Sequence, residues 1–304
     1  MKNYLVTGST GFIGVRLLGF LKTMECNVRL LSKTQVANYE TFECTLGQDR
    51  IPNGALKSID TVFHLAGLAH DVQNPQKVKN LYYLINVEAT LELARLAIDS
   101  GVKRFVFISS VKAGGIPVSG IYGTENNQSS PDGIYGESKR EAELRLLELA
   151  KDTDMHLSII RPTLVYGPGV KGNLKLMLSA IESGWFPPLP ETKSKRSMVH
   201  VDDLVGAIFL AANNSRANGE IFIVTDGLEY SSRKIYNIMR EILGKPRVKW
   251  SIPKALFDFI SLINSRLKHK VDKLFGGEFY SSKKLELLGF KAKKTLRDMN
   301  ETNF

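Results

Sequence analysis

The chain has 304 residues, of which 43% are hydrophobic and 24% are charged. A chain of this size and balance can bury one large core or two unequal ones, and it falls outside the fibrous, disordered and disulfide-framed classes. The formal net charge is +10 at pH 7, which favours anionic ligands. The basic residues are spread along the chain without the motifs of nucleic-acid-binding proteins, so we expect no nucleic-acid partner.

Cysteine usage and the apolar runs indicate a cellular compartment. Cys26 and Cys44 form no Cys-x-x-Cys motif and have no histidine cluster nearby, so we expect free thiols and no metal site. The N-terminus, Met1 to Thr7, leads straight into a glycine-rich turn and lacks the apolar core of a secretory signal. No apolar run reaches the roughly 18–20 residues that span a bilayer. We therefore expect a cytoplasmic protein with no integral membrane segment.

Short β-rich apolar runs alternate with segments of helical periodicity from residue 4 onward. The predicted strands are Tyr4–Thr7, Val28–Leu31, Thr61–Leu65, Phe105–Ile108 and Leu157–Ile160. The predicted helices between them are Ile13–Met24, Asn86–Asp99 and Ser138–Lys151. Strands joined by helices are parallel neighbours, so the pattern predicts an α/β fold: a Rossmann doubly wound parallel sheet with helices on both faces.

The regular alternation ends after Arg161-Pro162, where prolines become frequent. Two further strands, Met198–Val201 and Ile221–Val224, flank a helix from Asp202 to Asn213, and we expect all three to return to the first sheet. The sequence thus predicts a dinucleotide-binding Rossmann domain over residues 1–165. A smaller, interleaved C-terminal substrate lobe is expected over residues 166–304, with about 196–226 returning to the sheet.

A glycine-rich motif, Gly8-Ser-Thr-Gly11-Phe-Ile-Gly14, follows the first predicted strand and opens the first predicted helix. In this context glycines permit a tight turn and let the backbone approach a pyrophosphate, and the helix N-terminus offers free amide groups to it. The motif predicts a dinucleotide site. Its expected contacts are Gly8, Thr10, Gly11, Phe12, Ile13 and Gly14.

The second strand ends in Ser32-Lys33, where NAD-specific folds of this type often place an acid on the adenosine ribose. An acid would repel a ribose phosphate, whereas Ser32 and Lys33 can bind one. We therefore expect the cofactor to be NADP or NAD, with NADP preferred or at least tolerated. The alternative is that Lys33 is an ordinary solvated turn lysine.

Tyr135-Gly-Glu-Ser-Lys139 places a phenol and an ammonium four residues apart, on one face of a helix. A phenol has a pKa of about 10, and a nearby cation together with a positive nicotinamide ring would favour the phenolate. Tyr135 is thus a candidate general acid and base. Ser110 follows the strand Phe105–Ile108, at the edge where open α/β sheets bind ligands, and can donate a hydrogen bond to a sugar oxygen.

These motifs together resemble the extended short-chain dehydrogenase/reductase family, in its NAD-dependent epimerase/dehydratase branch acting on nucleotide sugars. The matching stretches are Val6–Gly14, His64–Gly67, Asn86–Thr90, Phe107–Ser110, Tyr135–Lys139, Arg161-Pro162, Val165–Pro168 and Arg196–Asp203. The resemblance implies that Ser110, Tyr135 and Lys139 are catalytic and that hydride moves between nicotinamide and a sugar carbon. It implies further cofactor contacts at Leu65, Ala66, Gly67, Asn86, Tyr135, Lys139 and Pro162.

The chain departs from the family pattern in two places. Gly67 stands where the family usually has alanine, and the stretch after Ser110 lacks the Asp-Glu pair that dehydratases use, which disfavours dehydration. Lys112 stands where many members have a small hydroxyl residue, and we assign it to the substrate. This stretch resembles the 4-epimerases and 4-keto reductases of bacterial polysaccharide gene clusters.

The resemblance also implies substrate contacts beyond Lys112. Asn173 matches an asparagine that contacts the nucleotide, and Arg196 matches an arginine directed at the diphosphate, where a guanidinium forms paired charge-assisted bonds. Lys270 and Lys273 are weaker candidates for the same diphosphate. His200 and Asp203 are expected to be structural, as a packed histidine and a scaffold acid.

Three functions remain open from the sequence. We favour reduction of a 4-keto nucleoside-diphosphate sugar, most simply a UDP-sugar, for polysaccharide synthesis; the main alternative is a UDP-sugar 4-epimerase with tightly bound NAD. A non-catalytic dinucleotide sensor is disfavoured because binding alone needs no Ser110, Tyr135 and Lys139.

We expect a homodimer. The apolar segment 255–267, next to Arg266, Lys268 and Lys270, is expected to pack on the lobe, with a subunit contact or a membrane surface as alternatives.

Overall fold

The computed structural model describes residues 1–69, 75–118, 121–263, 268, 271–272 and 274–299. Its centre is a seven-stranded parallel sheet in the order β3-β2-β1-β4-β5-β6-β9. The strands are β1 (Lys2–Thr7), β2 (Cys26–Ser32), β3 (Glu40–Glu43), β4 (Thr61–His64), β5 (Arg104–Ile108), β6 (His156–Pro162) and β9 (Glu220–Val224). The predicted Rossmann sheet is confirmed.

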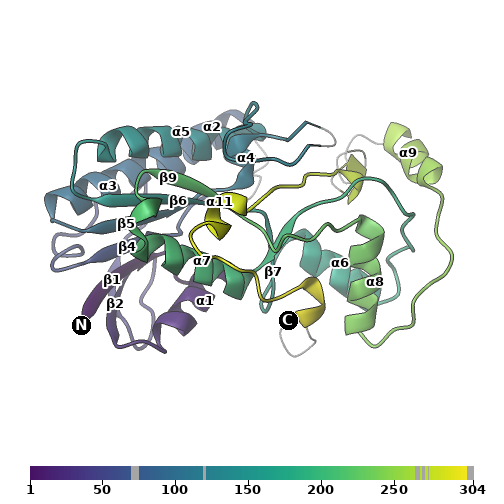
Figure 1. Ribbon diagram of the computed structural model, residues 1–304, viewed down its shortest axis with the longest axis horizontal. Coiled ribbons are helices and arrows are strands. Elements are labelled where there is room, and N and C mark those ends of the chain that lie inside the picture. Colours follow the sequence, from purple (N-terminus) through teal and green to yellow (C-terminus); the bar gives the residue numbers. More distant parts are fainter. Residues whose placement is uncertain (70–74, 119–120, 264–267, 269–270, 273, 300–304) are drawn as a thin grey trace.

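Helices cover both faces of this sheet. The helices are α1 (Phe12–Leu21), α2 (Pro75–Tyr83), the π-helical turn η1 (Leu84–Glu88), α3 (Ala89–Asp99), α4 (Val111–Gly114), α5 (Gly133–Ala150) and α7 (Val201–Asn213). Figure 1 shows α2, α3 and α5 over one face, and α1 and α7 over the other. The inner strands β4, β5 and β6 are buried almost throughout, as expected for parallel strands covered on both sides.

Two hydrophobic clusters fill these layers. One joins α3 and α5 to one side of the strands through residues such as Leu93, Phe105 and Leu146. The other joins α1 and α7 to the opposite side through residues such as Leu17 and Ile208. Successive strand residues alternate between the two clusters, so the sheet carries both cores and its carboxyl edge is a fixed platform.

One predicted strand pairs differently from expectation. Residues Met198–His200 form β8, which pairs in parallel with β7 (Leu164–Tyr166) in a separate two-stranded sheet and does not join the main sheet. The prediction of its return was wrong because β9 already occupies the place beside β6, up to the pair Pro162–Val224. The predicted strand Ile221–Val224 does join the main sheet, as β9, and the predicted helix Asp202–Asn213 covers that sheet, as α7. The short strands β3 and β7 were not predicted.

Helices α6 (Asn173–Glu182), α8 (Ser232–Ile242) and α9 (Lys254–Ile263) lie beyond the sheet, on the right in Figure 1. The short α11 (Lys283–Glu286) and the 3-10 turn η2 (Ser215–Ala217) contact the edge of the sheet at β9, and the 3-10 turn η3 (Leu296–Asp298) lies close to the C-terminus. A third hydrophobic cluster, including Leu178 and Met239, joins α6 to α8. The domain boundary at residue 165 stays a prediction. In the described ranges, no helix is both long and apolar enough to cross a bilayer.

A buried ion pair ties α5 to the sheet. Arg161 of β6 is fully buried and bonds both carboxylate oxygens of Glu143, with Nε–Oε1 at 2.8 Å and Nη2–Oε2 at 2.5 Å. Removing one partner of such a pair leaves a buried charge uncompensated.

We expect Glu143→Ala to lower the free energy of unfolding by about 3–5 kcal/mol, because Arg161 then remains charged and buried. Urea denaturation measures this. Lys268→Ala is the control: it breaks the exposed Lys268–Asp272 pair and should change stability by less than about 1 kcal/mol. Equal effects of the two substitutions would contradict the assigned role.

Candidate active site

The glycine-rich loop between β1 and α1 is packed so closely that side chains are excluded at two positions. Gly8 has φ of +69°, and a Cβ there would lie 2.6 Å from the amide nitrogen of Ala66. A Cβ on Gly14 would lie 2.2 Å from the carbonyl oxygen of Gly8. The first turn of α1 therefore lies directly against the loop, which leaves backbone amides at a helix N-terminus for an anionic group.

The side chains of the loop point away from that surface. Phe12 packs against the third cluster, and Ile13 packs against the α1–α7 cluster. A pyrophosphate at this place would therefore meet backbone and the small Thr10 side chain. This cradle of closely packed glycines fits the dinucleotide predicted from the sequence.

The other predicted cofactor residues lie at the same carboxyl edge of the sheet. Ser32 ends β2, the segment 65–67 follows β4, and Pro162 ends β6. Lys33 is exposed beyond Ser32. Because β2, β1 and β4 are adjacent parallel strands, the ends of β2 and β4 flank the glycine loop, whereas Pro162, at the end of β6, is separated from β1 by β4 and β5. Their contacts with a cofactor stay a prediction.

Asn86 fixes the segment that follows β4. Its Oδ1 accepts from the Leu68 amide at 2.7 Å, and its Nδ2 donates to the Leu68 carbonyl at 3.0 Å and to Ser138 Oγ at 2.9 Å. Ser138 Oγ donates in turn to the Tyr135 carbonyl at 2.8 Å. Asn86 thus positions the 65–68 segment against α5. Its side chain holds the backbone of that segment in place.

Ser110, Tyr135 and Lys139 come together at this edge. Tyr135 and Lys139 lie one turn apart on α5, and the Tyr135 hydroxyl lies near enough to Ser110, which follows β5 and caps α4, for that serine to lower its pKa. Lys139 is 3% exposed; its Nζ donates to the Ile108 carbonyl at 2.9 Å and lies 4.5 Å from the ring centroid of Phe107. The predicted constellation therefore exists as one cluster, with Lys139 buried at its base and Ser110 and Tyr135 half-buried.

Gly67 lies beside the ammonium. A Cβ on Gly67 would be 3.1 Å from Lys139 Nζ and 3.0 Å from Asn86 Oδ1. The glycine at this position, a departure from the family pattern, gives Lys139 and Asn86 room at the floor of the site.

Burial sets the protonation states of the cluster. It raises the pKa of Tyr135 to about 12, against a smaller lowering by the Ser110 hydrogen bond. Burial lowers the pKa of Lys139 to about 8, opposed by the negative charge of Glu143. The same cause lowers the pKa of His64, which bonds Thr7 and Thr90 beneath the site, to about 3. At neutral pH the protein alone thus holds a neutral phenol beside a cationic lysine and a neutral histidine.

Two of the three predicted substrate residues, Lys112 and Arg196, have partners within the protein. Lys112 forms a 2.7 Å ion pair with Asp132, which directly precedes α5. Arg196 Nη2 donates to the carbonyls of Leu274 and Gly276 at 2.9 and 3.0 Å. Asn173 is the exposed first residue of α6. The Lys112 backbone lies next to the cluster, since its amide donates to Ser110 Oγ at 3.3 Å, and the substrate roles of all three residues stay predictions.

Sequence reasoning missed the residues that support the cluster. Glu143 and Arg161 were not assigned roles, nor were Asp132 and Ser138. A signal for Glu143 was present: it stands four residues after Lys139, on the same helix face as the catalytic pair. Its partner on β6 was not visible from sequence spacing.

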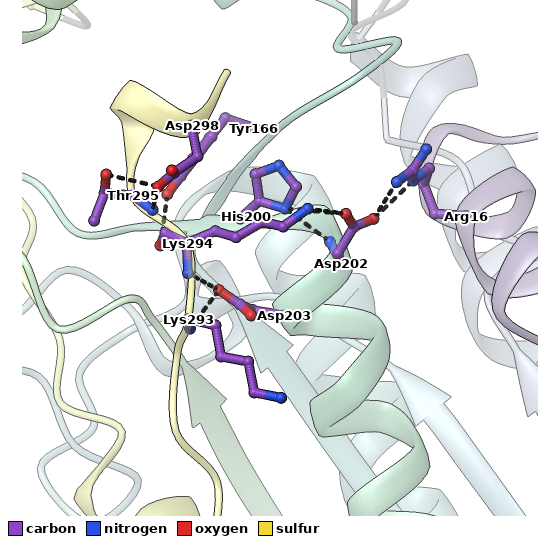
Figure 2. A network of polar contacts seen from close by, with 9 residues as sticks. All are labelled: Arg16, Tyr166, His200, Asp202, Asp203, Lys293, Lys294, Thr295 and Asp298. Carbon is purple, nitrogen blue, oxygen red and sulfur yellow. Dashed lines mark hydrogen bonds and ion pairs between the residues drawn. The ribbon is translucent and has the colours of Figure 1, made fainter. Parts of the chain in front are cut away.

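A polar network holds the helix of the glycine loop to the C-terminal segment (Figure 2). Arg16 of α1 pairs with Asp202 at 2.6 Å, and Asp202 also binds Lys294 at 2.5 Å. Asp203 accepts the amides of Lys293 and Lys294 at 3.0 and 2.9 Å. Buried His200 caps α7 by accepting from the Asp202 amide. Asp203 and His200 thus have the structural contacts expected of them.

A family model described as the NAD dependent epimerase/dehydratase family matches residues 4–225. The chain belongs to this family. The resemblance found in the motifs is confirmed, and the chain is an enzyme of the NAD-dependent, extended short-chain dehydrogenase/reductase type. Within the described residues, no group of three or more His, Cys, Asp or Glu side chains is placed to hold a metal ion.

Several relatives cover almost the whole chain. The "UDP-glucose 4-epimerase" of Vibrio cholerae is 35% identical, over 98% of this chain and 93% of its own length. The "N-acetyl-alpha-D-glucosaminyl-diphospho-ditrans,octacis-undecaprenol 4-epimerase" of Escherichia coli O157:H7 is 29% identical, over 97% and 92%. The solved structure "MoeE5 in complex with UDP-glucose and NAD" is 24% identical with a TM-score of 0.77, over 99% and 97%, which shows the shared fold.

Two glycines of α1 allow a matched test of the loop. Gly14→Ala should weaken dinucleotide binding more than tenfold, because the new methyl group collides with the Gly8 backbone. In the described part of the chain, no heavy atom lies within 4 Å of a Cβ on Gly19, so Gly19→Ala should leave binding unchanged. Titration calorimetry with NAD and NADP measures both variants. Equal affinities would contradict a cofactor at this loop.

The buried lysine predicts a pH-dependent stability. Lys139 has a pKa of about 8 in the folded protein and 10.5 in the unfolded chain, so between these values only the unfolded chain binds the proton and stability rises with pH. Lys139→Met lacks this gain. Relative to the variant, the wild type should gain roughly 2–3 kcal/mol between pH 7 and pH 10 in urea unfolding. The same difference at both pH values would refute a buried ammonium.

Proposed function

We propose that the chain interconverts the configuration at carbon 4 of a UDP-linked sugar, as a 4-epimerase with NAD held on the glycine loop. The cluster of half-buried Ser110 and Tyr135 with buried Lys139, beside that loop, is the observation that carries the proposal. The 35% identity to a UDP-glucose 4-epimerase over nearly the full length supports the substrate class. The lipid-diphosphate carrier of the second relative is the alternative to a nucleoside diphosphate.

NAD bound over Gly8 to Gly14 would supply a hydride acceptor and donor at the sugar carbon. The protein's part is proton transfer and orientation. Tyr135 takes the proton of the 4-hydroxyl as hydride leaves and returns it later, and Ser110 donates a hydrogen bond to the same oxygen. Lys139, one turn away, favours the phenolate through its charge. In the protein alone burial dominates and keeps the phenol protonated, so Tyr135 needs this help to act as a base.

Reduction of a 4-keto sugar by NADPH is the second candidate. It uses the same Ser110, Tyr135 and Lys139, and it is favoured by exposed Lys33 next to Ser32, where a ribose phosphate would be bound. The two reactions differ in whether the cofactor leaves after one hydride transfer. A homodimer remains our expectation for either.

Tyr135→Phe should reduce turnover by about 10²–10⁴-fold, because proton transfer at the sugar oxygen is lost, and should leave dinucleotide affinity nearly unchanged. The control is Tyr83→Phe, which removes a phenol hydroxyl that accepts from Arg145 at 2.9 Å outside the catalytic cluster. Steady-state kinetics compare the three proteins. Wild-type turnover in Tyr135→Phe would refute the assigned chemistry.

Cofactor retention separates the two candidate reactions. If the enzyme is an epimerase, the purified protein carries bound NAD, and it interconverts UDP-glucose and UDP-galactose without added cofactor. Mass spectrometry of the denatured protein identifies the dinucleotide, and the sugar products are followed by chromatography. A protein isolated without dinucleotide that consumes NADPH only with a 4-keto sugar would overturn the epimerase in favour of the reductase.

A further inference from the structure

Helix α9 presents apolar side chains to solvent. Leu256 is 48% exposed, Phe259 is 59% exposed and Leu262 is 83% exposed. At 100° per residue these three fall on one side of the helix. Phe257 lies on the other side, where its ring packs against Phe275 with centroids 5.2 Å apart. The helix is thus anchored to the protein by one face, and its exposed apolar face is available to another surface.

Both tryptophans of the chain are exposed on segments close to this helix. Trp185, at 87% exposure, follows α6, and Trp250, at 63%, precedes α9. The two segments run side by side, because the Ile252 amide donates to the Pro188 carbonyl at 3.0 Å. In Figure 1, α9 and the segment leading to it form the end of the molecule farthest from the N-terminal strands. Tryptophan is the residue that prefers the boundary between water and lipid.

The segment leading into α9 is strongly basic. Residues 245–254 contain four basic residues and no acidic one: Lys245, Arg247, Lys249 and Lys254. Arg247, Lys249 and Lys254 are exposed; Arg247 pairs with Glu241 and Lys254 pairs with Asp258, so four basic residues face two acidic partners at either end of the segment. The whole chain carries a net charge of +10, so the local charge is not offset by a strongly acidic remainder. Lysine next to an apolar face is depleted in protein–protein interfaces but is typical of helices that lie on anionic bilayers.

We propose that α9 and its flanking tryptophans form a membrane-docking face that binds the surface of an anionic bilayer. Leu256, Phe259 and Leu262 enter the boundary between headgroups and acyl chains, and Lys249, in the basic segment beside Trp250, meets the lipid phosphates. Phe275, on which α9 packs, belongs to the same segment whose carbonyls at Leu274 and Gly276 bind Arg196. Docking therefore holds the membrane close to the predicted diphosphate contact. Arg266, Lys270 and Lys273 lie outside the described residues and carry no part of this argument.

Vesicle co-sedimentation tests the proposal. The full-length protein is mixed with vesicles of phosphatidylcholine alone or with about one third phosphatidylglycerol. We expect pelleting with the anionic vesicles, a decrease as salt rises, and a blue shift of the fluorescence of Trp185 and Trp250 on binding. Absence of the wild type from the anionic pellet at low salt would overturn the proposal.

Charged substitutions locate the face. Phe259→Glu combined with Leu262→Glu should reduce binding to anionic vesicles more than tenfold, and both side chains are exposed, so the fold should survive. Leu287→Glu is the matched control: Leu287 is 76% exposed, but its carbonyl accepts from Arg216 beside the Rossmann sheet, and binding should be unchanged. Equal loss in both variants would overturn the assignment to α9.

Two further measurements separate the alternatives. Sedimentation equilibrium of the same proteins shows whether α9 is a subunit contact. If the wild type is a dimer that binds no vesicles, and the double variant is a monomer, then α9 binds a second copy of the chain and the membrane proposal is overturned. Turnover of UDP-sugars by the double variant should equal that of the wild type. Failure of the proposed reaction would appear in that assay, whereas failure of membrane docking would appear only with vesicles.

Discussion

The site depends on one ammonium group held inside the protein. Lys139 Nζ is surrounded by the Ile108 carbonyl and the face of Phe107, and among the described residues no carboxylate forms an ion pair with it. Glu143 lies one turn further along α5, but both its oxygens are bound by Arg161. The buried charge is unfavourable, as its lowered pKa shows. It persists because the strand end and the helix are fixed around it, and the positive charge is then available to the neighbouring phenol.

One face of α5 joins the chemistry to the core. Tyr135, Lys139 and Glu143 follow one another at four-residue intervals, so all three point toward the ends of β5 and β6. Tyr135 reaches Ser110, Lys139 reaches Ile108, and Glu143 reaches Arg161. The last pair fixes the rotation of the helix about its axis. A small rotation would separate the Tyr135 hydroxyl from Ser110, so the structural ion pair also determines the catalytic geometry.

The features that short-range patterns encode were predictable from the sequence. The glycine loop, the Tyr135–Lys139 spacing and the parallel sheet each follow from a few neighbouring residues and a repeated strand–helix alternation. The features that were missed depend on contacts between distant segments. Strand β8 pairs with β7 in a separate sheet because β9 lies next to β6 in the main sheet. Arg161 pairs with Glu143 across a helix–sheet contact. Nothing within either segment alone indicates its partner.

The expected cofactor half and substrate half of the site differ in the groups that form them, and this difference affects reaction specificity. The expected cofactor half consists of backbone: strand ends, a helix N-terminus, and a glycine loop that is closely packed at Gly8 and Gly14. The expected substrate half consists of long side chains that have other partners, Lys112 with Asp132 and Arg196 with the 274–276 carbonyls. Epimerisation and reduction use the same proton transfer by Tyr135. They differ in whether the 4-keto sugar rotates in the site before hydride returns to carbon 4. We therefore expect the substrate half, including the predicted diphosphate contact Arg196, to decide between them.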